Sequence, residues 1–111
     1  MFVDDGLKPA EALVDHVGQL LLEAADLIEQ YGWTQRAYGN RWTGFCVHGA
    51  LFFNHRQHGG TFDETINASG RFADYVGTID VIGWNDAPWR TKRQVIDALR
   101  AAAHKQEPVA Q

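Results

Sequence analysis

The sequence contains one cysteine, Cys46, and no long apolar run among its 111 residues. A single cysteine excludes an internal disulfide and favours a reducing compartment. No window approaches the roughly 18 apolar residues of a membrane-spanning helix. The N-terminus carries Asp4 and Asp5 where a secretory signal would carry basic residues. We therefore expect a soluble, cytoplasmic protein with no membrane partner.

Basic residues are scarce: ten Lys and Arg stand against 14 Asp and Glu, for a formal net charge of −4. Broad nucleic-acid binding needs a basic surface that neutralises phosphates, so nucleic acid is disfavoured as a partner. The charges are also uneven. Residues 1–31 hold seven acids and one base, whereas residues 90–105 hold five bases and one acid. Either these segments are complementary helices of one domain, or one end meets an acidic partner.

The composition is that of an ordinary globular domain. Apolar residues make up 45% and charged residues 22% of the chain, which argues against disorder. The length is that of one domain. We expect a single domain over residues 1–111, with a loose leader at 1–8, a folded core at 9–104 and a frayed tail at 105–111.

The first helix is predicted from apolar residues that recur at helical spacing over residues 10–31. Pro9 suits its first turn, and Gly32 stands where a helix stops. Gly18 and Leu22 fall on the polar side of this helix. Close packing therefore does not explain Gly18, and Leu22 is expected to be exposed, either without consequence or as a contact point.

Three further stretches are predicted to be helical. They cover residues 44–58, residues 63–75 and residues 92–104, the last preceded by the capping-box spacing of Thr91 and Gln94. Gly59 and Gly60 are expected to end the helix over 44–58. For the helix over 63–75, Thr61 or Asp63 is the expected cap and Gly70 a possible break.

Two connecting segments are predicted to be extended. Residues 33–45 alternate aromatic and polar side chains around the turn signal Gly39-Asn40, so a small hairpin is expected there. Residues 78–84 are predicted to form a short strand or an extended buried segment, and a turn-forming link over 84–91 follows. The fold class is therefore mostly α: one small domain of about four helices with a minor β-hairpin or extended element.

Four tryptophans lie in these connecting segments. They either complete a core that the helices leave open or form an aromatic surface beside nearby arginines. Trp, Tyr and Arg dominate binding hot spots. The same set could stack on the bases of a single strand, which the acidic balance disfavours. The residues predicted to contact a partner are Trp33, Gln35, Trp42, Trp84, Asn85 and Arg90.

Cys46 and His48 suggest a nucleophile and its base, since a reactive thiolate needs a base within hydrogen-bond reach. Two side chains at this spacing point in different directions on a helix. Cys46 would then need His16 or His104 as its base. A buried structural cysteine on the apolar face accounts better for this position.

The histidines and carboxylates offer further chemistry. His55 and His58 are three residues apart and could share one metal ion, but no third ligand is apparent. The carboxylates considered for acid–base chemistry are Asp74, Asp80 and Asp86. Asp86 is expected instead to cap the turn before Pro88. No phosphate-binding glycine loop, nucleophile elbow or zinc-ribbon spacing occurs. We expect no metal and no cofactor, and we assign no catalytic residue.

Two segments, residues 23–51 and 84–103, together resemble a known family. Their motifs are Glu23-Ala24-Ala25-Asp26-Leu27-Ile28-Glu29, Gly32-Trp33-Thr34-Gln35, Cys46-Val47-His48-Gly49-Ala50-Leu51, Trp84-Asn85-Asp86 and Arg90-Thr91. They are similar to a family of small uncharacterised domains from actinobacteria and their phages. Members carry more apolar residues in the Gly-Ala-Leu helix than His48, Asn54 and His55 provide. The family has no assigned activity, so the resemblance implies a bacterial or phage origin and no mechanism.

The predicted function is that of an accessory protein, more readily non-enzymatic than catalytic, which acts by protein–protein binding. The rival is a small enzyme or metal-dependent hydrolase that uses His55 and His58 or a thiolate at Cys46. A third alternative is a homo-oligomer that associates through Leu22 or exposed aromatic residues.

Overall fold

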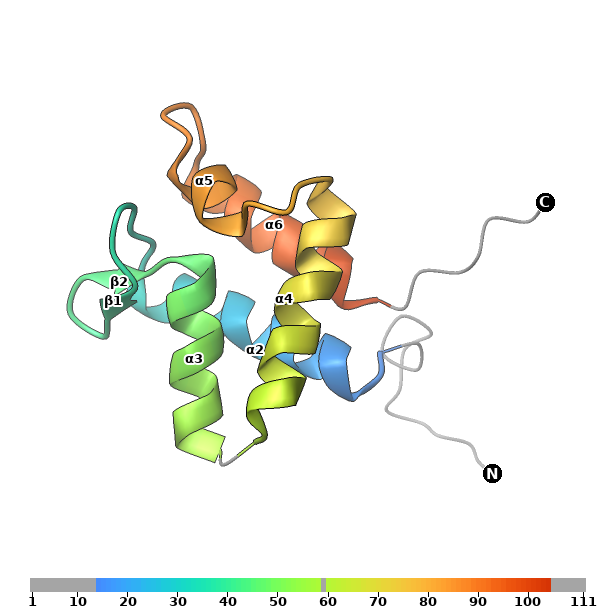
Figure 1. Cartoon of the computed structure of the whole chain (residues 1–111). Helices are drawn as coiled ribbons and strands as arrows, with labels where there is room; N and C mark the ends of the chain where they lie inside the picture. The colour runs from blue at the N-terminus through green and yellow to red at the C-terminus, as the bar shows by residue number, and fades with distance from the viewer. Residues whose placement is uncertain (1–13, 59, 105–111) are drawn as a thin grey trace, which may run out of the picture.

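The structure is a computed structural model that describes residues 14–58 and 60–104 (Figure 1). Within these residues, five helices and a two-stranded antiparallel hairpin form one mostly helical body, which confirms the predicted fold class. None of the helices in this part of the chain has both the length and the apolar character of a membrane span. The predicted leader at 1–8 and tail at 105–111 lie outside the described residues.

Helix α2 (His16–Tyr31) begins where Asp15 caps it. The Asp15 carboxylate accepts a hydrogen bond from the Gly18 N–H at 2.8 Å, as an N-cap does. Residues 14 and 15 are not helical, so the predicted continuous helix from residue 10 is wrong there, and residues 10–13 are not described. Gly32 ends the helix as predicted, with its N–H bonded to the Ile28 carbonyl. The residues that α2 buries are Gly18, Leu21, Ala24, Ala25 and Ile28.

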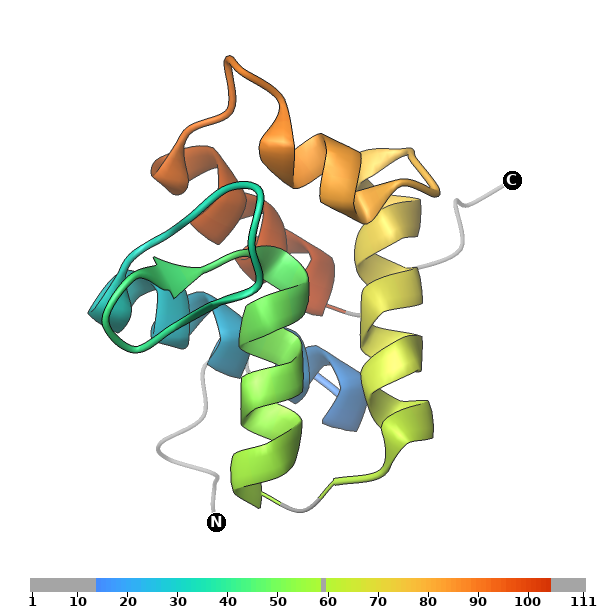
Figure 2. The same cartoon turned by 60° about the vertical axis from the view of Figure 1, so that its left-hand side comes forward.

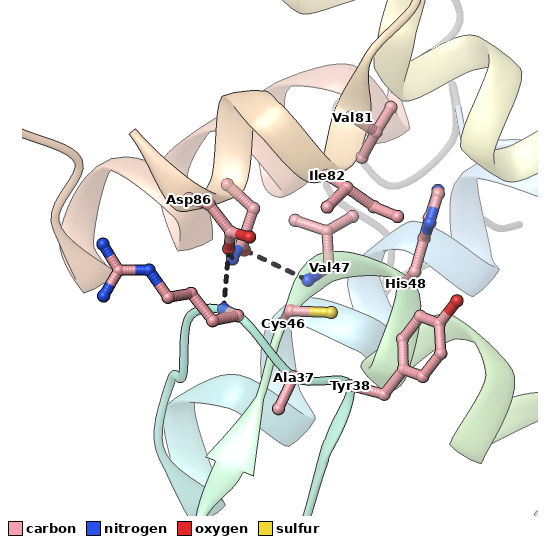
Figure 3. Close-up of a pocket in the computed structure, with 10 residues that line it drawn as sticks. Ala37, Tyr38, Cys46, Val47, His48, Val81, Ile82 and Asp86 are labelled. Atoms are coloured by element: carbon pink, nitrogen blue, oxygen red, sulfur yellow. Dashed lines mark hydrogen bonds between the residues drawn. The ribbon is translucent and has the colours of Figure 1, made fainter. Parts of the chain in front are cut away.

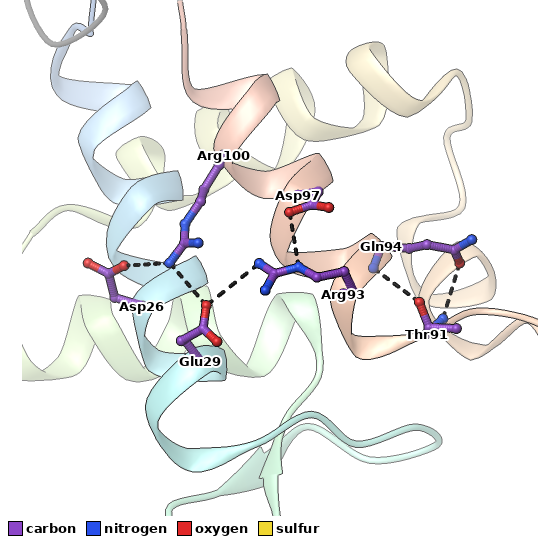
Figure 4. Close-up of polar contacts among 7 residues, drawn as sticks. All are labelled: Asp26, Glu29, Thr91, Arg93, Gln94, Asp97 and Arg100. Carbon is purple, nitrogen blue, oxygen red and sulfur yellow. Dashed lines mark hydrogen bonds and ion pairs between the residues drawn. The ribbon is translucent and has the colours of Figure 1, made fainter.

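Helix α6 (Lys92–Ala103) packs along α2 with complementary charge. The predicted Thr91–Gln94 capping box is present. Arg100 lies 3.2 Å from Asp26 and 3.3 Å from Glu29 of α2 (Figure 4). The acidic and basic segments therefore meet within one domain, which is the first of the two predicted explanations.

Gly18 is buried, and the prediction that close packing does not explain it is wrong. A Cβ at this position would overlap the carbonyl oxygen of Ala103 and lie 2.9 Å from Val14 Cγ1. The end of α6 crosses this side of α2, which a helical wheel drawn for one helix cannot show. Leu22 is likewise half-buried against the core and not the exposed contact point that was expected.

Helices α3 (Val47–His58) and α4 (Phe62–Val76) lie side by side, and both contact α2 (Figures 1 and 2). Of the two predicted caps of α4, Thr61 is the N-cap, in a capping box with Glu64. The predicted break at Gly70 is wrong because α4 continues through it, with the glycine facing open space. Side chains from all four long helices fill the core between them.

Residues 81–86 form helix α5 (Val81–Asp86), so the predicted strand or extended segment over 78–84 is wrong. The Asp80 side chain accepts a hydrogen bond from the Gly83 N–H at 2.8 Å and caps this short helix. The β-branched residues in the segment favour a strand, but the Asp80 cap stabilises the first turn of a helix here. Helix α5 turns Val81 and Asn85 into the interior.

The hairpin pairs β1 (Gly39–Asn40) with β2 (Gly44–Phe45). A hairpin was predicted in this region, but Gly39-Asn40 is a strand and the turn covers residues 41–43. Gly39 and Gly44 have φ of +90° and +88°, and a Cβ on Gly39 would overlap the Gly44 carbonyl oxygen. A Cβ on Gly44 would instead lie 2.5 Å from the Gly32 carbonyl carbon. Gly39 therefore lets the two strands approach, and Gly44 lets the hairpin pack against the end of α2.

Asp15 joins α2 to α4 by an ion pair that should make stability depend on pH. Its carboxylate lies 2.7 Å from Arg71 Nη2, and this pairing holds the pKa of Asp15 well below its usual 3.8. A carboxyl with a lowered pKa stabilises the fold above that usual value, and the contribution is lost as the pH falls. Asp15→Asn should therefore cost stability at neutral pH, by about 1 kcal/mol or less for so exposed a pair. Denaturant titrations between pH 7 and pH 2 should show the gap to wild type closing with acidification. Asp74→Asn, on the exposed side of α4, is the control, and a gap that widens in acid would contradict this assignment.

Candidate functional site

The six predicted contact residues fall into two places. Trp33, Gln35, Trp84, Asn85 and Arg90 gather where the segment after α2 meets α5. Trp42 lies apart from them, at the tip of the hairpin. The two places differ in what their side chains contact.

Asn85 is the centre of the first group and is 1% exposed. Its side-chain oxygen accepts hydrogen bonds from Trp33 Nε1 at 2.9 Å and from the Val47 N–H at 3.2 Å. Its side-chain nitrogen donates to the Thr34 carbonyl at 3.1 Å. One amide thus joins the segment after α2, the start of α3 and α5, and we call this group the Asn85 network.

Gln35 and Asp86 extend the Asn85 network. Gln35 Nε2 donates to the carbonyl oxygens of Asn85 and Ala87, at 3.1 and 2.9 Å. Asp86 accepts from the Arg36 N–H at 3.0 Å. The prediction that Asp86 caps the turn before Pro88 is wrong, because its carboxylate bonds across to a segment 50 residues earlier.

Trp84 and Arg90 form a second internal contact. The Arg90 guanidinium carbon lies 3.8 Å from the centre of the Trp84 ring, and Arg90 Nε donates to the Trp84 carbonyl at 2.9 Å. Trp84 also contacts Phe72 of the core, ring edge to ring face, with ring centres 5.2 Å apart. The five gathered residues therefore hold segments of the fold together, and their contact with a partner stays a prediction.

Trp42, unlike these five residues, projects into solvent, with 82% of its surface exposed. Its exposure is fixed by the turn that carries it. The Asn40 side chain accepts hydrogen bonds from the N–H groups of Trp42 and Thr43 at 2.8 and 2.9 Å, and the Thr43 hydroxyl accepts from Asn40 N at 3.0 Å. An Asx turn of this kind holds the backbone in one conformation.

A hollow of about 310 Å³ lies between the hairpin and α3, and we call it the hairpin groove. Its aromatic walls are the rings of Tyr38, Trp42, Phe45, Phe52 and Phe53. Arg41 and Arg56 also line it, and the Arg41 guanidinium lies 5.3 Å from the centre of the Trp42 ring. Tyr38 and Phe52 meet edge to face, with ring centres 6.2 Å apart.

The arginines near the hairpin are not used inside the fold. Arg36, Arg41 and Arg56 are exposed, and their guanidinium groups form no ion pair with any residue in the described part of the chain. The arginines of α4 and α6, by contrast, pair with acids of α2. Positive charge is therefore available beside the hairpin groove and neutralised elsewhere.

Cys46 and His48 line a second hollow but do not form an activated pair. The Cys46 sulfur accepts from the Gly49 N–H at 3.3 Å, and His48 Nε2 lies 2.8 Å from the Ser69 hydroxyl. Burial raises the pKa of the Cys46 thiol and lowers the pKa of His48, so both groups are neutral near pH 7. Cys46 is buried, as predicted for a structural cysteine. His16, proposed as an alternative base, pairs instead with Glu64 at 3.0 Å.

Of the predicted metal pair, His55 and His58, the structure describes the side chain of His55 alone. His55 has a buried Nδ1 without a hydrogen-bond partner among the described residues. Within residues 14–58 and 60–104, no three side chains of His, Cys, Asp or Glu come together as metal ligands would. Asp80 and Asp86, considered for acid–base chemistry, serve as the cap of α5 and as the acceptor for Arg36.

Sequence reasoning missed Tyr38 and Arg56 as parts of the hairpin groove. Tyr38 precedes β1 and Arg56 lies on α3, and no local pattern links positions 18 residues apart. Asn40 signals only the exposure of Trp42, because an Asn two residues before an aromatic residue can hold it at the tip of a turn.

Comparison with curated proteins and with solved structures gave no match. A family of unknown function, DUF6197, matches residues 13–105, a range that includes every residue the structure describes. The match agrees with the resemblance to an uncharacterised family and carries no activity. The chain therefore belongs to this family of unknown function, DUF6197.

Proposed function

We propose that this protein is a bacterial or phage accessory protein that binds a protein partner through the hairpin groove. The observation that carries the proposal is Trp42, which is 82% exposed and yet held in place by a hydrogen-bonded turn. Exposing a large aromatic ring to water costs free energy, which a partner that covers it recovers. Fixing the backbone that carries the ring beforehand removes part of the entropy cost of binding.

The charge around the groove favours an acidic segment of the partner. Arg41 and Arg56 line the groove without an acid of the described chain to neutralise them. Opposite charge at the rim of an interface speeds association and selects the partner. The aromatic floor would take an apolar side chain of the same segment.

The origin and compartment in this proposal rest on the sequence. The resemblance to small domains of actinobacteria and their phages supports a bacterial or phage origin. The single cysteine supports a cytoplasmic location. The Asn85 network takes no direct part in binding here and acts by holding the segment that carries the hairpin.

Affinity capture with the immobilised full chain from an actinobacterial lysate tests the proposal. Trp42→Ala should weaken retention of the captured protein about 30-fold, as expected for a central aromatic contact. Arg56→Glu should weaken it too, and raising the salt concentration should reproduce part of that loss.

Trp89→Ala is the matched control, because Trp89 is 72% exposed and lies outside the hairpin groove. Its retention should equal that of the wild type. Failure of the wild type to retain any protein, or equal retention by Trp42→Ala and wild type, would contradict the proposal.

A further inference from the structure

A second hollow, the Cys46 cavity, has a volume of about 250 Å³. It lies between residues 36–38, the start of α3 and helix α5 (Figure 3). Tyr38 lines both this cavity and the hairpin groove, and their other walls are separate. What the cavity binds is therefore a question independent of the partner proposed above.

The walls of the cavity are mostly apolar. Val47, Val81 and Ile82 contribute branched aliphatic side chains, and Tyr38 and His48 contribute rings. Figure 3 shows the Cys46 sulfur pointing toward the side where Tyr38 and His48 lie. Ligand sites in proteins typically combine such walls with a small number of convergent polar groups.

The polar groups of the cavity disfavour a charged ligand. The thiol and the imidazole are both neutral near pH 7, because burial disfavours their charged forms. Arg36 and Asp86, whose side chains carry opposite charges, both line the cavity. A charged molecule would lose its hydration against the apolar walls without gaining a net opposite charge.

Asp86 offers one specific polar contact. Its Oδ1 accepts hydrogen bonds from Arg36 N and Asn85 Nδ2, at 3.0 and 2.9 Å. Its Oδ2 accepts none from the described residues, and a carboxylate oxygen can accept about two. An N–H or O–H group on a ligand would find an acceptor there.

The volume sets the size of the ligand. A dry cavity of about 150 Å³ in another protein accommodates a benzene ring. A cavity of about 250 Å³ therefore takes one substituted ring or two fused rings. The wall at Arg36 is also held in place, although this residue has a φ of +65° that is rare outside glycine. The Arg36 N–H donates to Asp86, and the side chain of the preceding Gln35 donates to the Ala87 carbonyl.

We propose that the Cys46 cavity binds a small uncharged aromatic molecule of one or two rings that carries a hydrogen-bond donor. The aliphatic and aromatic walls cover the ring, and the Asp86 carboxylate accepts from its donor. The volume, the mostly apolar walls and the unfilled acceptor oxygen each point to this class of ligand.

Indole is the probe for this proposal. Titration of the isotopically labelled full chain should give saturable NMR shifts at Val47, Val81 and Ile82, with a dissociation constant on the order of 1 mM or tighter. Cys46 is the single cysteine of the chain, so a thiol-alkylating reagent reports on this cavity alone. Saturating indole should slow its alkylation several-fold.

Ile82→Trp should fill the cavity and abolish both effects, whereas Ile79→Trp, at a fully exposed residue outside the cavity, should leave them intact. Indole-3-acetate and tryptamine should bind at least about tenfold more weakly than indole, because each carries a charge. Absence of saturable shifts with indole, or equal binding to Ile82→Trp, would overturn the proposal. Equal binding of a charged analogue would overturn the uncharged class. None of these results depends on Trp42.

Discussion

Asn85→Ala should lower the free energy of unfolding by about 4 kcal/mol. The substitution leaves the Trp33 indole N–H, the Val47 N–H and the Thr34 carbonyl without their partner. Each polar group stranded in the interior costs about 1–3 kcal/mol. Equilibrium denaturation in urea measures the loss, with tryptophan fluorescence as one probe and circular dichroism as the other.

Two further variants show whether the loss comes from hydrogen bonding. Asn85→Asp has the same shape and keeps both acceptor contacts, but it loses the donor to Thr34 and sets a second carboxylate beside Asp86. It should fall between wild type and Asn85→Ala. Asn67→Ala, at an exposed position of α4, should change stability by no more than about 0.5 kcal/mol. A loss below about 1 kcal/mol for Asn85→Ala would mean that the Asn85 network does not hold these segments together.

Gly18→Ala should lower the free energy of unfolding by about 2–3 kcal/mol, although alanine is the better helix former. The added methyl group would overlap the Ala103 carbonyl oxygen, which is backbone and cannot rotate away. Helices α2 and α6 would have to move apart, and the Arg100 ion pairs with α2 would lengthen. Thermal and urea unfolding of the variant measure the cost.

Gly70→Ala is the matched control in another helix. A Cβ there meets nothing within 4 Å, so the substitution should raise stability by up to about 1 kcal/mol. The two changes are chemically identical and should have opposite signs. If Gly18→Ala were also stabilising, the close approach of α6 to the start of α2 would be wrong.

The regular part of the fold could be predicted because its signals are local. The capping box at Thr91 and Gln94 and the apolar stripe behind it suffice to place α6. Helix α5 was missed because six residues are too few for a helical period to show, and its β-branched residues favour a strand. Gly18 was misjudged for a different reason, since only the packing of another helix against it explains the glycine.

For the predicted contact residues, too, the residue types could be predicted from the sequence and their contacts could not. Aromatic and arginine side chains in the connecting segments could be recognised by type alone. Their environments could not, because the hydrogen bond of Trp33 to Asn85 joins positions 52 residues apart. The sequence therefore placed Trp33 and Trp42 in one predicted surface. In the structure, the indole N–H of Trp33 lies in the Asn85 network, whereas Trp42 is exposed.

Residues of the segment between α2 and α3 thus point to two different sides. Trp33 and Gln35 face inward and fix the segment on α5. Tyr38, Arg41 and Trp42 border the hairpin groove. A rigid inner side is what lets a short hairpin present exposed aromatic residues in one arrangement, which supports the proposal of a binding surface there.

Calorimetric titration of the purified captured protein onto wild type and Trp42→Ala, with unfolding measured on the same samples, tests the proposed binding surface most directly. Because Trp42 contributes little to the core, the variant should keep its stability within about 0.5 kcal/mol while its affinity falls about 30-fold. An intact Trp42→Ala variant that binds the captured protein as tightly as the wild type would contradict the hairpin groove as the binding surface.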